Sequence, residues 1–126
     1  MKALQKALKL NAIFSGTSGI VLILLHIQIS KVFGTSNSTV FWIVGIALIY
    51  FALSIWYECI KVRKMAILWI IIQDYLWVMG SLILVVFDPF EISFLGHLLV
   101  LSIALIVLYM AINQHLELKK YTNYKL

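Results

Sequence analysis

Four long apolar stretches constrain this chain more than any other feature of its sequence. They cover residues 10–30, 40–59, 65–87 and 93–114. Each is close to the roughly 20 residues that a helix needs to cross the hydrocarbon core of a bilayer. A spanning strand would need only about 10 residues with alternating hydrophobicity, and no such alternation extends over a whole span. The predicted fold class is therefore all-α, a transmembrane four-helix bundle.

The composition also indicates that lipid surrounds this chain. The chain has 126 residues, of which 63% are hydrophobic and only 12% are charged. Soluble domains carry about 25% charged residues, so this chain has too few charges to cover a water-facing surface. We therefore argue against a soluble enzyme, a disordered chain and a nucleic-acid-binding domain. The single cysteine, Cys59, excludes an internal disulfide and a zinc site built from cysteines.

The connections between the four stretches are short and polar. They lie near residues 34–39, 61–64 and 88–91, which leaves no room for a domain outside the spans. Pro89 follows the third stretch, and Ser93 is placed to cap the helix that comes next. We therefore expect one domain over residues 1–126.

The distribution of basic residues predicts the orientation. With four spans, nine of the ten lysines and arginines fall on one side, and only Lys31 falls on the other. The nine are Lys2, Lys6, Lys9, Lys61, Arg63, Lys64, Lys119, Lys120 and Lys125. Basic residues are retained on the cytoplasmic side of a membrane, so both termini are predicted to be cytoplasmic. The same residues should attract acidic membrane lipids.

Asp74 is the one acidic residue deep inside a span. At 100° per residue, Trp77 and Ser81 share its helix face, and Gly80 would let another backbone approach. A buried carboxylate costs at least a few kcal/mol unless it is neutral or paired. Two interpretations follow: a site linked to a proton or a cation, or a neutral acid that packs helices together through hydrogen bonds.

The first span carries a matching polar stripe. Asn11, Ser15 and Ser18 share one helix face, and residues 15–19 are all small. Ser18 lies at the same depth as Asp74, so we expect the first and third spans to touch there. Two interpretations follow: a seam of small residues whose hydroxyls bond back to their own helix, or a polar pocket, which is a candidate site for a ligand. Its predicted walls are Asn11, Ser15, Ser18, Asp74, Trp77 and Ser81.

Two histidines form a second candidate site. His26 and His97 are predicted at equal depth near the other end of the bundle. Such a pair can ligate a haem axially or bind a metal. The alternative interpretation is that each histidine is simply hydrogen-bonded or exposed to water near the interface. The sequence contains no nucleophile elbow, no His-Glu-x-x-His and no glycine-rich phosphate loop, so we expect neither an enzyme nor a resident cofactor.

Two segments carry a resemblance to known proteins. Residues 11–19 (NAIFSGTSG) and 74–81 (DYLWVMGS) are similar to a pattern in uncharacterised small four-span bacterial integral membrane proteins. The resemblance implies a multi-pass protein of the bacterial plasma (inner) membrane. It carries no established activity, so no functional residue is transferred.

Three functions are consistent with these patterns. The first is a non-enzymatic membrane protein whose polar cluster around Asp74 packs the bundle and binds a small lipophilic or cationic ligand. The second is a small proton-coupled transporter that acts as a dimer. The third is a haem- or quinone-linked redox subunit that uses His26 and His97. Membrane lipids are the expected partners, with a second copy or a larger membrane complex as further candidates.

Overall fold

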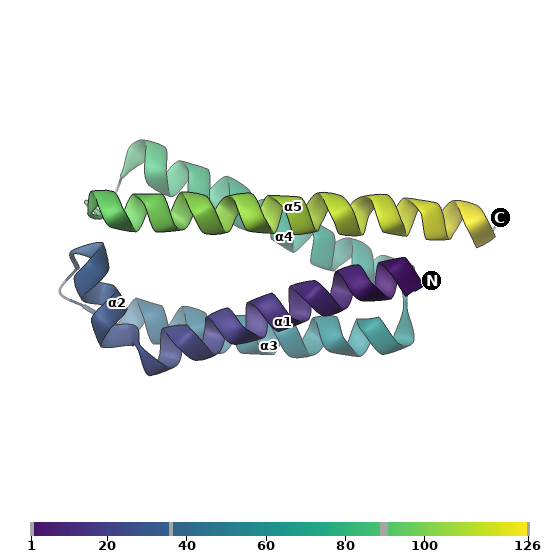
Figure 1. Ribbon diagram of the computed structural model, residues 1–126, viewed down its shortest axis with the longest axis horizontal. Coiled ribbons are helices and arrows are strands. Elements are labelled where there is room, and N and C mark those ends of the chain that lie inside the picture. The colour runs from purple at the N-terminus through teal and green to yellow at the C-terminus, as the bar shows by residue number, and fades with distance from the viewer. Residues whose placement is uncertain (1, 36, 89–90, 126) are drawn as a thin grey trace.

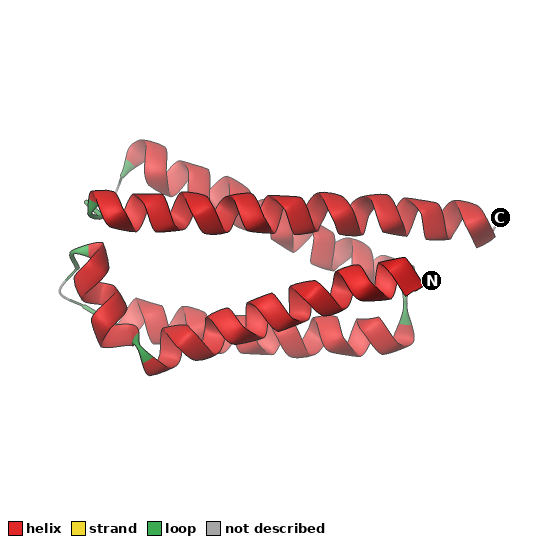
Figure 2. Ribbon diagram, in the orientation of Figure 1, coloured by secondary structure: helices red, strands yellow, loops and turns green. Residues whose placement is uncertain are grey.

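The computed structural model describes residues 2–35, 37–88 and 91–125, and this part of the chain is helical apart from short connections (Figures 1 and 2). The helices are α1 (Lys2–Leu24), α2 (His26–Phe33), α3 (Thr39–Lys61), α4 (Lys64–Phe87) and α5 (Phe94–Lys125). All except α2 are long and apolar enough to cross a membrane. The all-α prediction with four spanning-length helices is thus confirmed.

The helix bounds depart from the predicted spans at three places, the first being that α1 begins at Lys2 and not near residue 10. The first predicted span, residues 10–30, is divided, because α1 ends at Leu24 and α2 starts at His26. The fourth helix was expected to end near Gln114, but α5 continues to Lys125. Hydropathy indicates only the length of chain that is apolar enough for lipid. The helix itself can continue beyond that length through Lys, Glu, Gln and Leu, which are all good helix formers.

Two helix pairs build the molecule. α1 packs along α3, α4 packs along α5, and the pairs meet mainly through α1 and α5 (Figure 1). α3 and α4 make few contacts with each other, although only Val62 and Arg63 separate them in sequence. The bundle is therefore open along the α3–α4 side.

The small residues of α1 contact α3 and not the third predicted span. A Cβ atom on Gly19 would lie 2.6 Å from the carbonyl oxygen of Gly45, and one on Gly16 would lie 3.5 Å from Ala52. Around Gly80, in contrast, nothing lies within 4 Å of the Cβ position. The expectation that Gly80 admits another backbone was therefore wrong, and the close helix approach occurs in the α1–α3 pair.

The two ends of the bundle differ in character. The N-terminus, the C-terminus and the connection from α3 to α4 lie at one end (Figure 1). At the other end, Ser93 links α2 to α5, since its N–H donates to the Phe33 carbonyl at 2.9 Å. The Ser93 hydroxyl accepts a hydrogen bond from the Gly96 N–H at 3.0 Å, so the predicted helix cap is confirmed. Pro89 lies outside the described residues.

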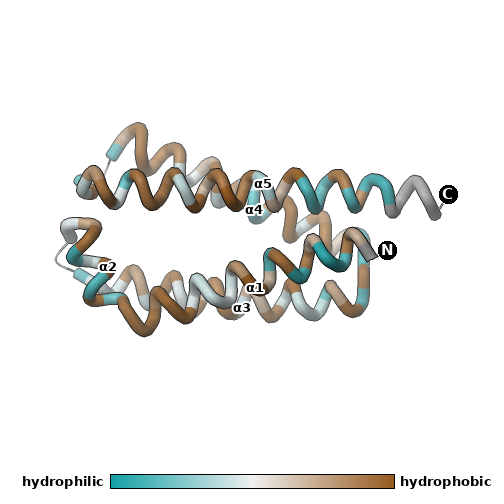
Figure 3. Tube along the Cα trace, in the orientation of Figure 1, coloured by the Kyte–Doolittle hydropathy of each residue, from teal (hydrophilic) through white to brown (hydrophobic). Residues whose placement is uncertain are grey.

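Large apolar side chains point outward and several polar ones point inward. Val86, Phe87 and Phe94 are each more than 70% exposed, whereas Asn11 and Gln114 are fully buried. Along the chain, apolar residues occupy the helix lengths and hydrophilic residues gather towards the ends (Figure 3). In water such an apolar surface would promote association of the protein, whereas in the hydrocarbon of a membrane the same surface is favourable.

Candidate functional site

Four polar side chains from three helices form one hydrogen-bonded group, which we call the Asp74 cluster. It consists of Asn11 and Ser15 of α1, Asp74 of α4 and Gln114 of α5. Asn11 Nδ2 donates to Asp74 Oδ2 at 2.7 Å, and Gln114 Nε2 donates to the same oxygen at 2.8 Å. Asn11 Nδ2 also donates to Gln114 Oε1 at 3.1 Å. The cluster therefore ties the two helix pairs together.

Almost every polar atom of the cluster has a partner. Gln114 Nε2 also donates to the Met110 carbonyl at 3.0 Å, and Ser15 Oγ donates to Asn11 Oδ1 at 3.0 Å. Each amide nitrogen thus uses both of its hydrogens. Such saturation is what low-dielectric surroundings require, because a buried donor without an acceptor is costly.

Asp74 Oδ1 is the exception. Both amide donors reach Oδ2, and no hydrogen bond among the described residues reaches Oδ1. Oδ1 is not completely enclosed either. In the described part of the chain, His97 Nδ1 is the only completely enclosed side-chain nitrogen or oxygen without a hydrogen-bond partner. Asp74 itself is only 3% exposed. One carboxylate oxygen therefore retains a little accessible surface and its full capacity to accept.

Asp74 also lies in the lining of a pocket of about 660 Å³, which we call the Asp74 pocket. All five helices contribute to its walls, and most of the lining is aliphatic or aromatic. The polar side chains in the lining are Ser15, Thr17, Ser18, Gln73 and Asp74, together with the indole of Trp77. Asp74 is the only one of these that can carry a charge. The pocket thus combines apolar walls with one acidic group.

The predicted site residues divide into three sets. Asn11 and Ser15 join Asp74 through hydrogen bonds, whereas Ser18 and Trp77 line the same pocket without a side-chain hydrogen bond to described residues. Asn11 and Ser81 were both predicted as walls, but both lie outside the pocket lining, and the Ser81 hydroxyl donates to the Trp77 carbonyl of its own helix at 2.8 Å. Trp77 and Ser81 share the helix face of Asp74, but among the described contacts neither side chain forms a hydrogen bond with its carboxyl group.

Gln114 is the member of the cluster that the sequence analysis missed. The predicted fourth span ends at this residue, but α5 continues beyond it for another 11 residues to Lys125. One signal for it existed in the sequence. Ala104 and Ala111 are small residues seven apart that mark a buried face of α5, and Gln114 is three residues further along that face.

The two histidines have separate partners. His26 Nδ1 lies 2.9 Å from Ser38 Oγ, and His97 Nε2 lies 3.1 Å from Asp88 Oδ1. In the described residues no three histidine, cysteine or acidic side chains are grouped in a way that would hold a metal ion. Both histidines therefore take part in contacts at the connections of the α2 end, where they fix loops to helices.

Comparison of the chain with protein-family models, with curated proteins and with solved structures gives no match.

Proposed function

We propose that this chain is a non-enzymatic, multi-pass protein of the bacterial plasma membrane that binds a small lipophilic cation in the Asp74 pocket. The distribution of basic residues supports a cytoplasmic position for both termini. Four helices of spanning length and an apolar outer surface support the membrane location. The location and the orientation are parts of the proposal.

One observation carries the ligand assignment: Asp74 is the only side chain in the pocket lining that can carry a charge, and no hydrogen bond among the described residues reaches its Oδ1. A carboxylate left without a counter-charge in hydrocarbon costs at least a few kcal/mol. A proton on Oδ1 removes that cost, and so does a cationic ligand. The pocket volume of about 660 Å³ lies in the range of known small-molecule sites. Its aliphatic walls suit an apolar body, and the Trp77 indole offers an aromatic face for a cation.

The test uses two ligands of nearly the same shape. 1-Naphthylmethylamine is a cation at neutral pH, and 1-naphthylmethanol is its uncharged analogue. We expect purified protein in detergent to bind the amine at least about tenfold more tightly than the alcohol, measured by titration calorimetry. Asp74→Asn should abolish this preference, because asparagine can still accept from both amides but carries no charge. Equal binding of both ligands by the unaltered protein would disprove the assignment.

Ser81→Ala is the matched control. Ser81 is on the same helix as Asp74, two turns away, and bonds only within that helix. Its replacement should leave the preference for the amine intact. An unchanged preference in Asp74→Asn would show that the charge selectivity arises elsewhere.

Proton-coupled transport by a dimer is the second candidate. The observation in its favour is that Asp74 Oδ1 receives no hydrogen bond from described residues, so that a proton and a cation could compete for it, as exchange requires. Movement of protons out of proteoliposomes in response to a gradient of the amine would distinguish transport from binding.

A further inference from the structure

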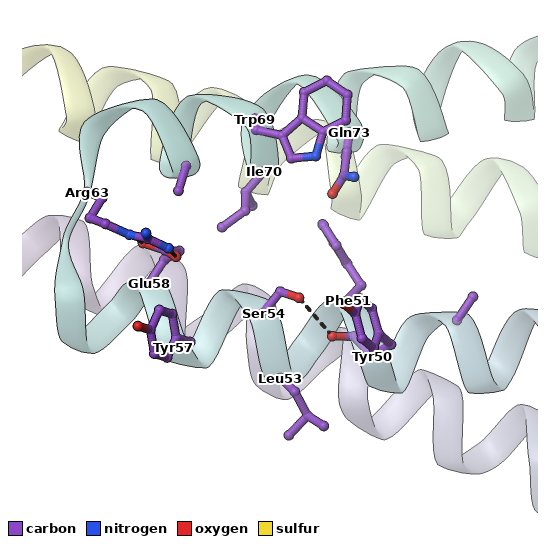
Figure 4. A pocket seen from close by; sticks show the side chains of 12 residues that line it. Tyr50, Phe51, Leu53, Ser54, Tyr57, Glu58, Arg63, Trp69, Ile70 and Gln73 are labelled. Carbon is purple, nitrogen blue, oxygen red and sulfur yellow. Dashed lines mark hydrogen bonds and ion pairs between the residues drawn. The ribbon is translucent and has the colours of Figure 1, made fainter.

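A second hollow lies between α3 and α4, and we call it the α3–α4 groove. It has a volume of about 720 Å³ and is lined by side chains of both helices and of the connection between them (Figure 4). It exists because α3 and α4 make few contacts along their length. A hollow of this kind on a helix surface that faces hydrocarbon does not stay empty, so some component of the membrane fills it.

Charged residues stand at one end of the groove. Glu58 is 5% exposed and accepts two hydrogen bonds from Arg63, one of them from Nε to Oε1 at 3.0 Å. This contact raises the pKa of Arg63 above its ordinary value, so the guanidinium stays charged. The Arg63 side chain remains 60% exposed, and Lys61 and Lys64 lie beside it in sequence. Glu58 and Arg63 are the charged residues of the groove lining and neutralise each other, so the net positive charge at this end comes from the two lysines of the adjoining connection.

The remaining length of the groove has a different chemistry. Tyr57 lies near the charged end, where the Arg63 guanidinium stands 5.3 Å from its ring centre and Lys61 Nζ stands 5.8 Å away. Deeper in, Ile70 points from α4 towards α3 (Figure 4), and Trp69 of α4 is also among the lining residues. The last lining residue of α4, Gln73, is about 15 Å along the helix from Arg63. The groove therefore runs from the basic α3–α4 connection along aromatic and aliphatic side chains, with the polar groups of Tyr50, Ser54 and Gln73 among them.

We propose that the α3–α4 groove binds one anionic phospholipid of the cytoplasmic leaflet, with its phosphate at the Lys61–Lys64 connection and an acyl chain between α3 and α4. The charge complementarity selects the headgroup, and the length of the groove suits an acyl chain better than a soluble anion. A second copy of the chain would bring like charges to the same end. The inference rests on the membrane placement proposed above and is independent of the Asp74 ligand.

Trp69 provides the probe, because it lines the groove and is 57% exposed. A variant with Trp42→Phe, Trp56→Phe and Trp77→Phe keeps it as the only tryptophan. In liposomes we expect phosphatidylglycerol with brominated acyl chains to quench Trp69 at a mole fraction at least about fivefold lower than brominated phosphatidylcholine. Equal quenching by the two lipids would overturn the proposal.

Three variants separate a site from general surface attraction. Lys61→Gln with Lys64→Gln should reduce the preference for phosphatidylglycerol towards one. Lys6→Gln with Lys119→Gln removes the same number of positive charges at positions outside the groove, and it should preserve the preference for phosphatidylglycerol. Ala66→Phe fills the groove and should reduce quenching by both lipids. Arg63 is retained throughout, since its loss would leave buried Glu58 without a partner.

Each adverse outcome has a distinct meaning. If the Lys6 and Lys119 changes weaken the preference as much as the Lys61 and Lys64 changes do, the attraction is diffuse and no site exists. If Ala66→Phe leaves quenching unaltered, the acyl chain does not lie in the groove. Failure of the membrane placement itself would appear separately, as protein that does not float with the liposomes.

Discussion

At the residue scale, the Asp74 cluster shows how a polar interior is tolerated among apolar helices. Two amide side chains, Asn11 and Gln114, direct hydrogens at a single oxygen of Asp74. Neither amide has a water-facing alternative, because both residues are fully buried. The carboxyl group is thus the shared acceptor for side chains of α1 and α5. Its removal should lower the stability of the protein more than the loss of its charge alone.

Asp74→Leu is expected to lower the free energy of unfolding by about 2–4 kcal/mol, because it leaves amide donors of Asn11 and Gln114 without an acceptor. Asp74→Asn should cost less than about 1 kcal/mol, since its carbonyl oxygen can take over both hydrogen bonds. Unfolding in mixed micelles with increasing SDS, followed by circular dichroism, measures both values. Similar losses in the two variants would show that charge, and not hydrogen bonding, gives Asp74 its structural role.

The sequence identified part of this cluster and not the rest, for a physical reason. An acid in an apolar span is conspicuous because its burial is expensive, so Asp74 could be found from composition alone. Asn11 and Ser15 could be found from helical spacing. Gln114 could not be paired with Asp74 in the same way, because the pairing depends on the crossing of α4 and α5, which periodicity within one helix does not determine.

At the element scale, hydropathy predicted which segments are helices but not which helices pack together. The lengths near 20 residues follow from the lipid dimension, and they recovered α3 and α4 closely. Two other features lie outside that reasoning. The break at Leu25 contains neither proline nor glycine, and the small residues of α1 face α3 because Gly45 there offers a matching gap.

The α1–α3 contact supplies a prediction at this scale. Gly19→Ala and Gly45→Ala should each destabilise the protein by about 1–3 kcal/mol, because the added methyl group meets backbone at 2.6 Å and 2.7 Å respectively. Gly80→Ala should be neutral or stabilising by up to about 1 kcal/mol, since nothing lies within 4 Å of its Cβ position and alanine is the better helix former. Thermal unfolding in detergent compares the three variants. A loss in Gly80→Ala equal to the other two would contradict the α1–α3 packing.

At the scale of the whole molecule, the helix arrangement and the charge pattern reinforce each other. The sequence places nine basic residues in three separate segments, and the fold gathers those segments at one end of the bundle (Figure 1). An odd number of crossings would have divided the termini between opposite ends. The positive end also contains the mouth of the α3–α4 groove, so the feature that should orient the protein also creates a surface for anionic lipid.

The proposed orientation predicts which positions react with a thiol reagent that cannot cross the membrane. In a Cys59→Ser background, Asn37→Cys lies in the connection before α3, whereas Ala3→Cys and Met65→Cys lie at the end that carries the termini. All three positions are exposed, and none of the substitutions changes a charge. An impermeant maleimide should label Asn37→Cys in intact cells and the other two only after the membrane is opened, because the basic segments are held in the cytoplasm. Labelling of Met65→Cys from outside would reverse the orientation, and opposite results for Ala3→Cys and Met65→Cys would exclude the four-span topology.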